Sequence, residues 1–277
     1  MTPEPNLVNR LKIRLRPLDE RLKLRHKLHV ALLPLLPRRA ELAKLRDCGK
    51  GQRCFIMGNG PSLKKIDPAP LAREVTFGTN AIYLAKDWLG FLPTYHVTED
   101  QLVVEDRGSE ISQLQGPLKF YDRRWLGRIP PNGRVINPRV FYDYAEYSGF
   151  PLFSRDAAKC LWVGGTVSYL CIQLAYYMGY DPVYLIGFDH HYVKPEHVST
   201  NGAVWTSHGD DPNHIHPSYF GAGRRWHDPR VDRMEMAYSR AKEIFAVDGR
   251  HIFNATMGGA LEVFDRVDFA ELMATPS

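Results

Sequence analysis

Several common signals are missing from the sequence. Its four cysteines form no C-x-x-C pair, a usage typical of buried thiols in a reducing compartment. No apolar run reaches about 18 residues and no signal peptide is recognisable, so we expect a cytoplasmic protein that does not cross a membrane. The sequence also has neither a Walker loop, which requires G-K-[ST], nor a dinucleotide-binding G-x-G-x-x-G motif.

A strong charge of one sign is absent from most of the chain. Residues 1–50 contain 13 of the 36 Lys and Arg residues and 5 of the 31 acids, a formal charge of +8, whereas the remaining 227 residues carry −3. A globular part this close to neutral argues against a broad nucleic-acid-binding face. We therefore expect no nucleic-acid partner.

What is present fits an α/β protein. With 44% hydrophobic and 12% aromatic residues, the chain has enough apolar material for a core. Its length suits one large domain or a domain with an appendage. We expect a basic helical extension and linker over residues 1–50 and a Rossmann-like domain over 51–277. That domain should have a mostly parallel sheet flanked by helices, and an irregular, His-rich lid at about 190–228.

The most informative stretch is CFIMGNGPSL at residues 54–63. An apolar run ends abruptly in GNGPS, the order expected of a first strand, a tight phosphate-accepting turn and a helix start. Gly58 and Gly60 permit a ligand to approach the backbone closely. Asn59 offers a donor and an acceptor to a ribose or phosphate, and Ser62 is suited to capping exposed amides. An ordinary Gly-Pro turn is the alternative interpretation.

Leucines alternate with basic residues through residues 7–36. The apolar positions recur at roughly helical spacing, namely Leu18, Leu22, Leu28, Leu32 and Leu35. A basic amphipathic helix of this kind suits docking of residues 7–46 on an anionic membrane surface. It equally suits packing on the domain or pairing in a homo-oligomer, and the sequence leaves these interpretations open.

Further strands are predicted at residues 75–78, 94–97, 119–121, 135–136 and 250–254. Asn80 follows the second strand, so the βαβ spacing places it at the carboxyl edge of the sheet beside Asn59. Glu99 and Asp100 follow the third strand; acids there suit a metal or a sugar hydroxyl, but a solvated loop explains them more simply. Residues 137–162 are aromatic and irregular, and either cover an acceptor site or fill space under a loop.

A buried helix is predicted after the sequence GGTVS at residues 164–168. Thr166 is its expected N-cap, Gly179 follows its C-terminus, and its apolar residues lie all round the helix. A helix start that faces the carboxyl edge of the sheet is a good site for a carboxylate or phosphate. Gly164, Gly165, Thr166 and Ser168 are therefore candidate ligand-binding residues.

The apolar run at 183–187 is the most convincing central strand, and it delivers Asp189 and His191 to the same edge. The segment 194–227 shows no periodicity but contains five histidines, His197, His208, His214, His216 and His227. An irregular stretch of this length is more often a functional lid than an idle loop. Asp228 and Pro229 then signal a helix start, and the tail from Leu261 suits a short helix.

These elements as a set resemble the MptE-like family, named for archaeal 6-hydroxymethylpterin diphosphokinases. The run GNGPSLKKID, Asn80, the GGTVSYL helix start and the YLIGFD strand carry the resemblance, which covers roughly residues 53–264. The motility-associated flagellin glycosyltransferases share this domain. The same elements resemble the family-42 sialyltransferases, which have a Rossmann-like sheet, a lid and a CMP-sugar donor.

The sialyltransferase resemblance implies roles for matching residues. Asn59 would contact the donor phosphate or ribose, and Asn80 the nucleotide or sugar. Gly165, Thr166 and Ser168 would bind the sugar carboxylate. Asp189 matches the acid that ends the late strand, and His191 stands where that family has a tyrosine that holds the phosphate. His216 and His227 are the candidates for the lid histidine that acts as base toward the acceptor hydroxyl, a role suited to imidazole near pH 7.

The resemblance favours a glycosyltransferase that needs no metal cofactor. It would move a sugar, such as a nonulosonic acid, from a CMP-linked or similar donor to a cell-surface glycan or lipid-linked acceptor at the inner membrane face. The alternative enzyme is a Mg²⁺-dependent diphosphokinase that uses ATP and a pterin-like alcohol, for which the possible ligands are Asp189, Asp210, Asp211, Glu99 and Asp100. A metal site of Asp189, His191, His214 and His216 is a weaker hypothesis. A non-catalytic nucleotide- or glycan-binding protein is the third.

Overall fold

The computed structural model describes residues 23–193, 198–201 and 204–274. Its centre is a seven-stranded sheet in the order β12-β8-β1-β2-β3-β4-β5, in which every neighbouring pair is parallel. The strands are β1 (Cys54–Met57), β2 (Thr76–Thr79), β3 (Tyr95–Thr98), β4 (Leu118–Tyr121), β5 (Val135–Ile136), β8 (Val183–Ile186) and β12 (Ile252–Asn254). This Rossmann-like α/β arrangement confirms the predicted fold class, and each predicted strand is present with its ends shifted by at most two residues.

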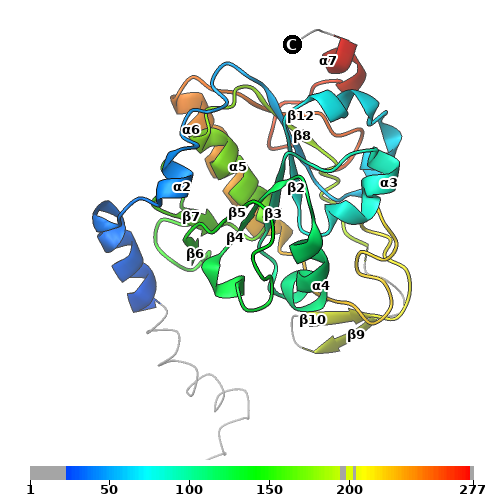
Figure 1. Cartoon of the computed structure of the whole chain (residues 1–277), viewed down its shortest axis with the longest axis horizontal. Helices are drawn as coiled ribbons and strands as arrows, with labels where there is room; N and C mark the ends of the chain where they lie inside the picture. Colours follow the sequence, from blue (N-terminus) through cyan, green and yellow to red (C-terminus); the bar gives the residue numbers. More distant parts are fainter. Residues whose placement is uncertain (1–22, 194–197, 202–203, 275–277) are drawn as a thin grey trace, which may run out of the picture.

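Helices cover both faces of this sheet (Figure 1). The α-helices are α2 (Ala40–Ala43), α3 (Lys86–Leu89), α4 (Gln101–Gln113), α5 (Val167–Tyr177), α6 (Val231–Val247) and α7 (Phe269–Ala274). The 3-10 helices are η1 (Leu33–Leu35), η2 (Pro61–Lys65), η3 (Ala69–Arg73), η4 (Ile82–Ala85) and η5 (Arg123–Trp125). Helices α5 and α6 lie on one side of the sheet, and α3 and α4 lie on the other.

Strand β1 shows how the sequence builds two cores from one strand. All four of its residues are buried, and successive side chains point to opposite faces. Cys54 and Ile56 join the apolar cluster that contains α5 and α6, whereas Phe55 and Met57 join the cluster on the other face. A strand covered on both faces has no polar side, which explains why this run is apolar throughout.

Helix α5 forms as its sequence predicts. The Thr166 side chain accepts a hydrogen bond from the Ser168 amide, and Gly179 adopts a φ of +86° just beyond the C-terminus. By contrast, the helix expected directly after Asp228 and Pro229 begins only at Val231, and no side chain caps it. Residues 228–230 are instead the connection between the lid and α6.

Two parts expected to be irregular contain strands. The aromatic segment holds the parallel pair β6 (Val140–Tyr142) and β7 (Leu161–Val163). The buried Gln173 amide of α5 fixes this pair by accepting from the amides of Ser154 and Trp162 and donating to the Trp162 carbonyl. The lid contains the antiparallel strands β9 (Val198–Asn201), β10 (Val204–Ser207) and β11 (Arg225–His227). These strands are too short and mixed to produce a readable alternation.

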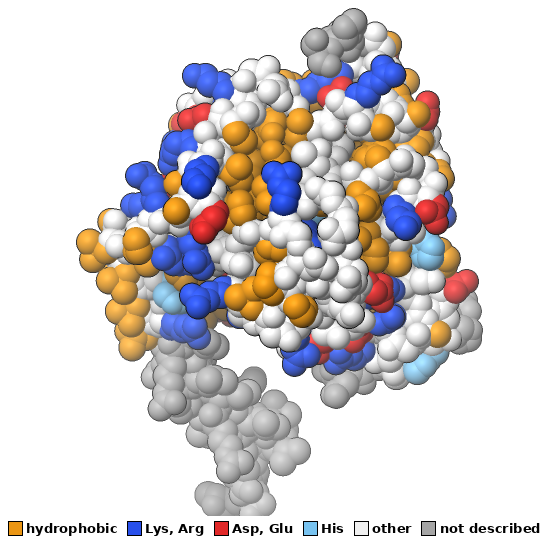
Figure 2. Space-filling view, in the orientation of Figure 1, with side chains coloured by type: hydrophobic (Ala, Val, Ile, Leu, Met, Phe, Trp, Pro, Cys, Tyr) orange, Lys and Arg blue, Asp and Glu red, His pale blue; other side chains and the backbone are white. Residues whose placement is uncertain are grey.

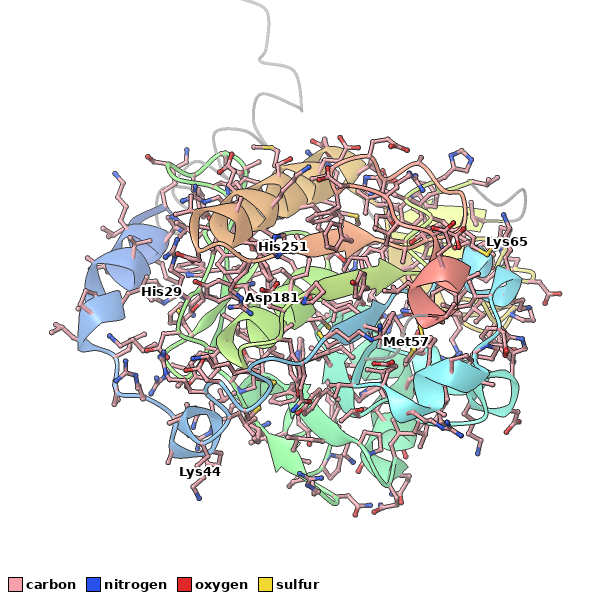
Figure 3. The ribbon with its side chains drawn as sticks, turned by 90° about the horizontal axis from the view of Figure 1, so that it is seen from above. His29, Lys44, Met57, Lys65, Asp181 and His251 are labelled. Atoms are coloured by element: carbon pink, nitrogen blue, oxygen red, sulfur yellow. The ribbon has the colours of Figure 1, made fainter. Side chains whose placement is uncertain are left out.

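The described part of the N-terminal extension packs on the domain. Residues 23–32 are helical, and buried His26 lies 4.6 Å from the Tyr147 ring. His29 stacks on Phe141 at 4.2 Å and lies between this helix and the rest of the chain (Figure 3). Leu42, expected in a linker, is fully buried in the main core. The expected helix before residue 23, like His197 of the lid, lies outside the described residues.

Candidate active site

The point where the strand order reverses lies between β1 and β8. The chain passes from β1 to β2 on one side and from β8 to β12 on the other, so the carboxyl ends of β1 and β8 diverge. Open α/β sheets bind ligands at this position. The Gly58 amide donates to the Ile186 carbonyl at 2.8 Å, and the Gly60 amide to the Gly187 carbonyl at 3.0 Å. A Cβ atom on Gly58 would lie 2.4 Å from the Gly187 carbonyl oxygen, so this close backbone contact requires glycine.

Asp189 occupies the turn that the sequence assigns to a phosphate. Its carboxylate accepts from the Ser62 amide at 3.2 Å and from the Ser62 hydroxyl at 2.5 Å. A Cβ atom on Gly60 would lie 1.8 Å from this carboxylate. The prediction that amides of the GNGPS turn bind a donor phosphate is therefore wrong for Gly58, Gly60 and Ser62, because their N–H groups already donate within the protein.

Asn59 and Asn80 lie together at this edge, as the βαβ spacing predicts. The Asn59 amide group donates to the Thr79 hydroxyl at 2.7 Å and to the Tyr219 hydroxyl at 3.2 Å. Its side-chain carbonyl oxygen is buried and has no hydrogen-bond partner within residues 23–193, 198–201 and 204–274. Asn80 adopts a φ of +46°, and its side-chain oxygen accepts from the Glu99 amide. The unpaired Asn59 oxygen is an acceptor that a bound hydroxyl or amino group would satisfy.

These residues border a cavity of about 620 Å³ that the lid partly covers. Ten of the thirteen residues predicted for the site line it: Gly58, Asn59, Gly60, Asn80, Gly165, Thr166, Ser168, Asp189, His191 and His227. Segments far apart in the sequence thus meet in one space. The individual roles of these residues stay predictions.

Three predicted residues do not line the cavity, namely Ser62, Gly164 and His216. Ser62 is buried against Asp189. A Cβ atom on Gly164 would lie 2.6 Å from Ala237 of α6, so this glycine serves the contact between α5 and α6. The His216 Nδ1 atom accepts from the Ser218 amide at 3.1 Å, which places its ring in a turn of the lid.

His227 is the lid histidine that the structure pairs with a carboxylate in the cavity. It ends β11, and its Nδ1 atom lies 3.6 Å from an Asp100 carboxylate oxygen. The other Asp100 oxygen caps α4 by accepting from the Leu102 and Val103 amides at 2.8 and 3.0 Å. The Asp100 carboxylate raises the pKa of His227, because it stabilises the imidazolium form. An imidazole held in this way can accept a proton on Nε2.

Glu99 is the second titratable group at this end of the cavity. Burial, reinforced by the neighbouring Asp100 charge, raises the pKa of Glu99 to about 7, and Arg124 opposes the shift. The sequence interpretation of Glu99 and Asp100 as a solvated loop is wrong, since both side chains line the cavity and Asp100 begins α4. Carboxyl groups with raised pKa values cluster at functional sites.

A second lid histidine, His214, also faces the cavity. Its Nδ1 atom lies 2.7 Å from Asp211, and its ring stacks on Tyr219 with centroids 4.1 Å apart. Asp211 also accepts from the Asn213 and Phe220 amides, so it is committed to holding the lid. Within the described residues, no group of three or more His, Cys, Asp or Glu side chains is arranged to hold a metal ion.

Arg233 is a cavity residue that the sequence reasoning missed. Its guanidinium lies over the rings of Tyr144 and Phe150 at 5.0 and 5.2 Å, and its Nε atom is buried without a partner. Burial lowers the pKa of Arg233. A Cβ atom on Gly165 would lie 3.1 Å from its side chain, which places this cation beside the start of α5. The sequence feature that could have indicated Arg233 is the pair of arginines in DPRVDR, at the start of α6.

The lid is attached to α4 by charged groups. Arg225 lies 2.9 Å from Glu105 and 2.8 Å from Asp106. Arg224 donates to the Asp106 carbonyl at 2.8 Å, and Arg107 of α4 donates to the carbonyls of Ser218 and Tyr219. Because Asp100 caps the same helix, these contacts fix the position of His227 relative to Asp100.

Comparisons with known proteins leave the family open. No protein-family model and no curated protein matches the chain. Among solved structures, the chain is similar to the MAf glycosyltransferase from Magnetospirillum magneticum AMB-1, with 16% sequence identity and a TM-score of 0.47. The similarity covers 82% of this chain but only 37% of that protein.

Replacing Asp100 by Asn should lower the pKa of His227. Asparagine can still cap α4 through its side-chain oxygen, but it removes the negative charge that favours the imidazolium, and partial burial of the ring then favours the neutral form. The His227 ring resonances, followed by NMR between pH 4 and about 9, measure the change. An Asp265→Asn control, whose exposed carboxylate pairs with Lys242, should not move them. An unchanged His227 titration in Asp100→Asn would refute the coupling.

Proposed function

We propose that this protein is a glycosyltransferase that moves a sugar from a nucleotide-activated donor to a cell-surface glycan or lipid-linked acceptor. The observation that carries the proposal is the Asp100–His227 pair, which a lid strand places at the cavity on the strand-order reversal. That position suits a nucleotide, and a carboxylate-supported histidine suits removal of a proton from an acceptor hydroxyl.

The donor would bind along the carboxyl edge of the sheet. Asn59 contributes an unpaired buried oxygen for a hydroxyl or amino group of the nucleoside. The start of α5, with Gly165, Thr166 and Ser168, offers a positive helix end to the carboxylate of a nonulosonic acid. Arg233, next to Gly165, adds a full positive charge. These features favour an acidic sugar on a nucleotide-linked donor, and the resemblance to the family-42 sialyltransferases suggests CMP as the nucleotide.

The reaction would be an inverting displacement. An acceptor hydroxyl gives its proton to His227 as its oxygen bonds to the anomeric carbon, and the bond from that carbon to the phosphate oxygen breaks. Asp100 stabilises the imidazolium that forms. The departing nucleotide carries the new negative charge, which Arg233 and His191 at the cavity wall would offset. A positioned base of this kind contributes about 100-fold or more.

The diphosphokinase alternative has weaker support. It needs carboxylates free to hold Mg²⁺, but Asp189 is bonded to Ser62 and Asp211 to His214. Asp210 is exposed and does not line the cavity. Only Glu99 and Asp100 remain of the five expected ligands, and Asp100 already caps α4.

A thermal-shift panel of CMP, CDP, UDP, GDP and ATP, with and without Mg²⁺, tests the donor assignment. CMP or CDP should stabilise the wild type without metal, by about 2.7 kcal/mol at 100 times the Kd. Asn59→Ala should lose the effect, whereas Asn132→Ala, a surface control that lies outside the cavity, should retain it. Stabilisation by ATP alone and only with Mg²⁺ would contradict the proposal and favour the diphosphokinase.

We also propose that the N-terminal helix docks on an anionic membrane surface. Leu24, Leu28 and Leu32 recur every four residues along residues 23–32, and each is about half exposed at 59, 50 and 47%. Figure 2 shows apolar side chains along the outer edge of this helix with basic side chains beside them. Across the described residues, no helix has the length and apolar character needed to span a bilayer. An exposed apolar stripe with adjacent positive charge is typical of interfacial helices.

Cosedimentation with vesicles tests this docking. The protein should bind vesicles that contain phosphatidylglycerol and should bind phosphatidylcholine vesicles weakly, since anionic lipids attract the basic residues. Leu28→Ser with Leu32→Ser should remove most of the binding, whereas Val247→Ser, an exposed apolar control on α6, should not. Equal binding of all variants, or a stable dimer that the double substitution dissociates, would contradict membrane docking.

A further inference from the structure

A second cavity, of about 600 Å³, lies beside the first. Its walls come from the N-terminal helical segment 23–32, from η5 and from the aromatic segment around β6. Among the described residues, five arginines line it, namely Arg25, Arg39, Arg123, Arg124 and Arg139, together with one carboxylate, that of Asp122. The rest of the domain is nearly neutral, so this concentration of one charge is a local feature.

Within the described part of the chain, Arg124 is the one arginine of this wall that lies near a carboxylate in an ion pair, that of Asp122. The Asp122 carboxylate accepts from the Arg124 amide at 2.9 Å and from the Val140 amide at 3.2 Å, and it lies 3.8 Å from the Arg124 guanidinium. Arg139 donates to two backbone carbonyls, which carry no net charge. The Arg39 Nε atom is buried and has no hydrogen-bond partner in the part of the chain that the structure describes. A desolvated guanidinium with an open donor is stabilised by an anion.

A buried histidine, His26, adds polar atoms to the wall of this cavity. The His26 side chain lines the cavity and is 5% exposed, and neither ring nitrogen has a hydrogen-bond partner among the described residues. The nearest carboxylate oxygen, that of Asp143, is 3.6 Å from Nδ1. Burial, reinforced by the positive charge of Arg25, lowers the pKa of His29, a neighbouring wall residue. Buried polar atoms normally have hydrogen-bond partners, and a bound group would supply them to the His26 ring.

The two cavities share a wall. Arg124, Tyr142 and Tyr144 line both, and the Arg124 guanidinium lies 4.3 Å from the Tyr142 ring centroid. A group held in the second cavity is therefore adjacent to the space in which His227 and Asp100 lie. A cavity of this size with several arginines suits a compact, multiply charged group such as a phosphate or diphosphate.

We propose that this second cavity binds a phosphate-bearing group of the acceptor. The assignment of this group to the acceptor rests on the proposed glycosyltransferase function, whereas the binding of an anion does not. A lipid-linked diphosphate and a soluble sugar phosphate present the same chemistry. The helix that supplies Arg25 and His26 exposes Leu24 and Leu28, so a lipid tail attached to the anion would have an apolar surface nearby.

Calorimetric titration with inorganic pyrophosphate tests the site. The wild type should bind pyrophosphate, and Arg25→Gln with Arg123→Gln should weaken binding at least 10-fold, since each charge-assisted contact contributes about 1.5 kcal/mol or more. Both side chains belong to exposed residues, so the double variant should fold. Arg73→Gln with Arg134→Gln removes the same charge outside both cavities and should bind as the wild type does. Absent or equal binding in wild type and Arg25→Gln/Arg123→Gln would overturn the proposal.

Two further titrations separate this site from the donor cavity and identify the source of the anion. Asn59→Ala should bind pyrophosphate normally, and Arg25→Gln/Arg123→Gln should bind CMP normally. If CMP binds neither the wild type nor Arg25→Gln/Arg123→Gln while pyrophosphate binds as expected, the donor assignment fails and the anion site stands. Geranyl phosphate and glucose 1-phosphate should both bind more weakly to the double variant. Tighter binding of geranyl phosphate by the wild type supports a lipid-linked acceptor, and tighter binding of glucose 1-phosphate supports a soluble one.

Discussion

The site depends on the close approach of two chain segments where β1 and β8 end. Backbone hydrogen bonds join Gly58 to Ile186 and Gly60 to Gly187. Neither Gly58 nor Gly60 has room for a side chain. Asp189 then fills the turn by binding Ser62. This contact fixes the floor of the cavity, because Asn59 lies between the two glycines and its neighbour Asn80 follows the adjacent strand. Asp189 thus places a carboxylate in the turn where the sequence predicts a phosphate.

The lid brings charged side chains from separate elements together at the cavity. Arginines of the lid bind acids of α4, and the same helix begins at Asp100, opposite His227. Glu99, whose pKa burial raises to about 7, adds a second group that exchanges protons near neutrality. The cavity therefore combines proton acceptors on the lid side with cations near α5.

The sequence predicts the main sheet well, because buried parallel strands are continuous apolar runs that end in polar residues at one edge. The same pattern places Asn59, Asn80 and Asp189 at that edge, whereas His227 is predicted as a lid histidine from the family resemblance. It does not show that Asp189 binds Ser62, since the same turn residues suit a phosphate. The lid strands are missed because they mix polar and apolar residues without a regular alternation, and the β6–β7 pair because it lies in an aromatic stretch without strand periodicity. The arginine cavity is also missed, as its residues come from segments about 100 positions apart in the chain.

The most direct test of the account is the release of free nucleotide from a panel of CMP-, UDP- and GDP-sugars, measured by chromatography. The wild type should turn over a CMP-linked acidic sugar in the presence of an acceptor. His227→Gln should be slower by about 100-fold or more, because the base is removed. His216→Gln is the matched control, as its ring lies in a lid turn outside the cavity, and it should retain the wild-type rate. Equal rates for His227→Gln and the wild type, or loss of activity only in His216→Gln, would contradict the assignment of His227 as the base.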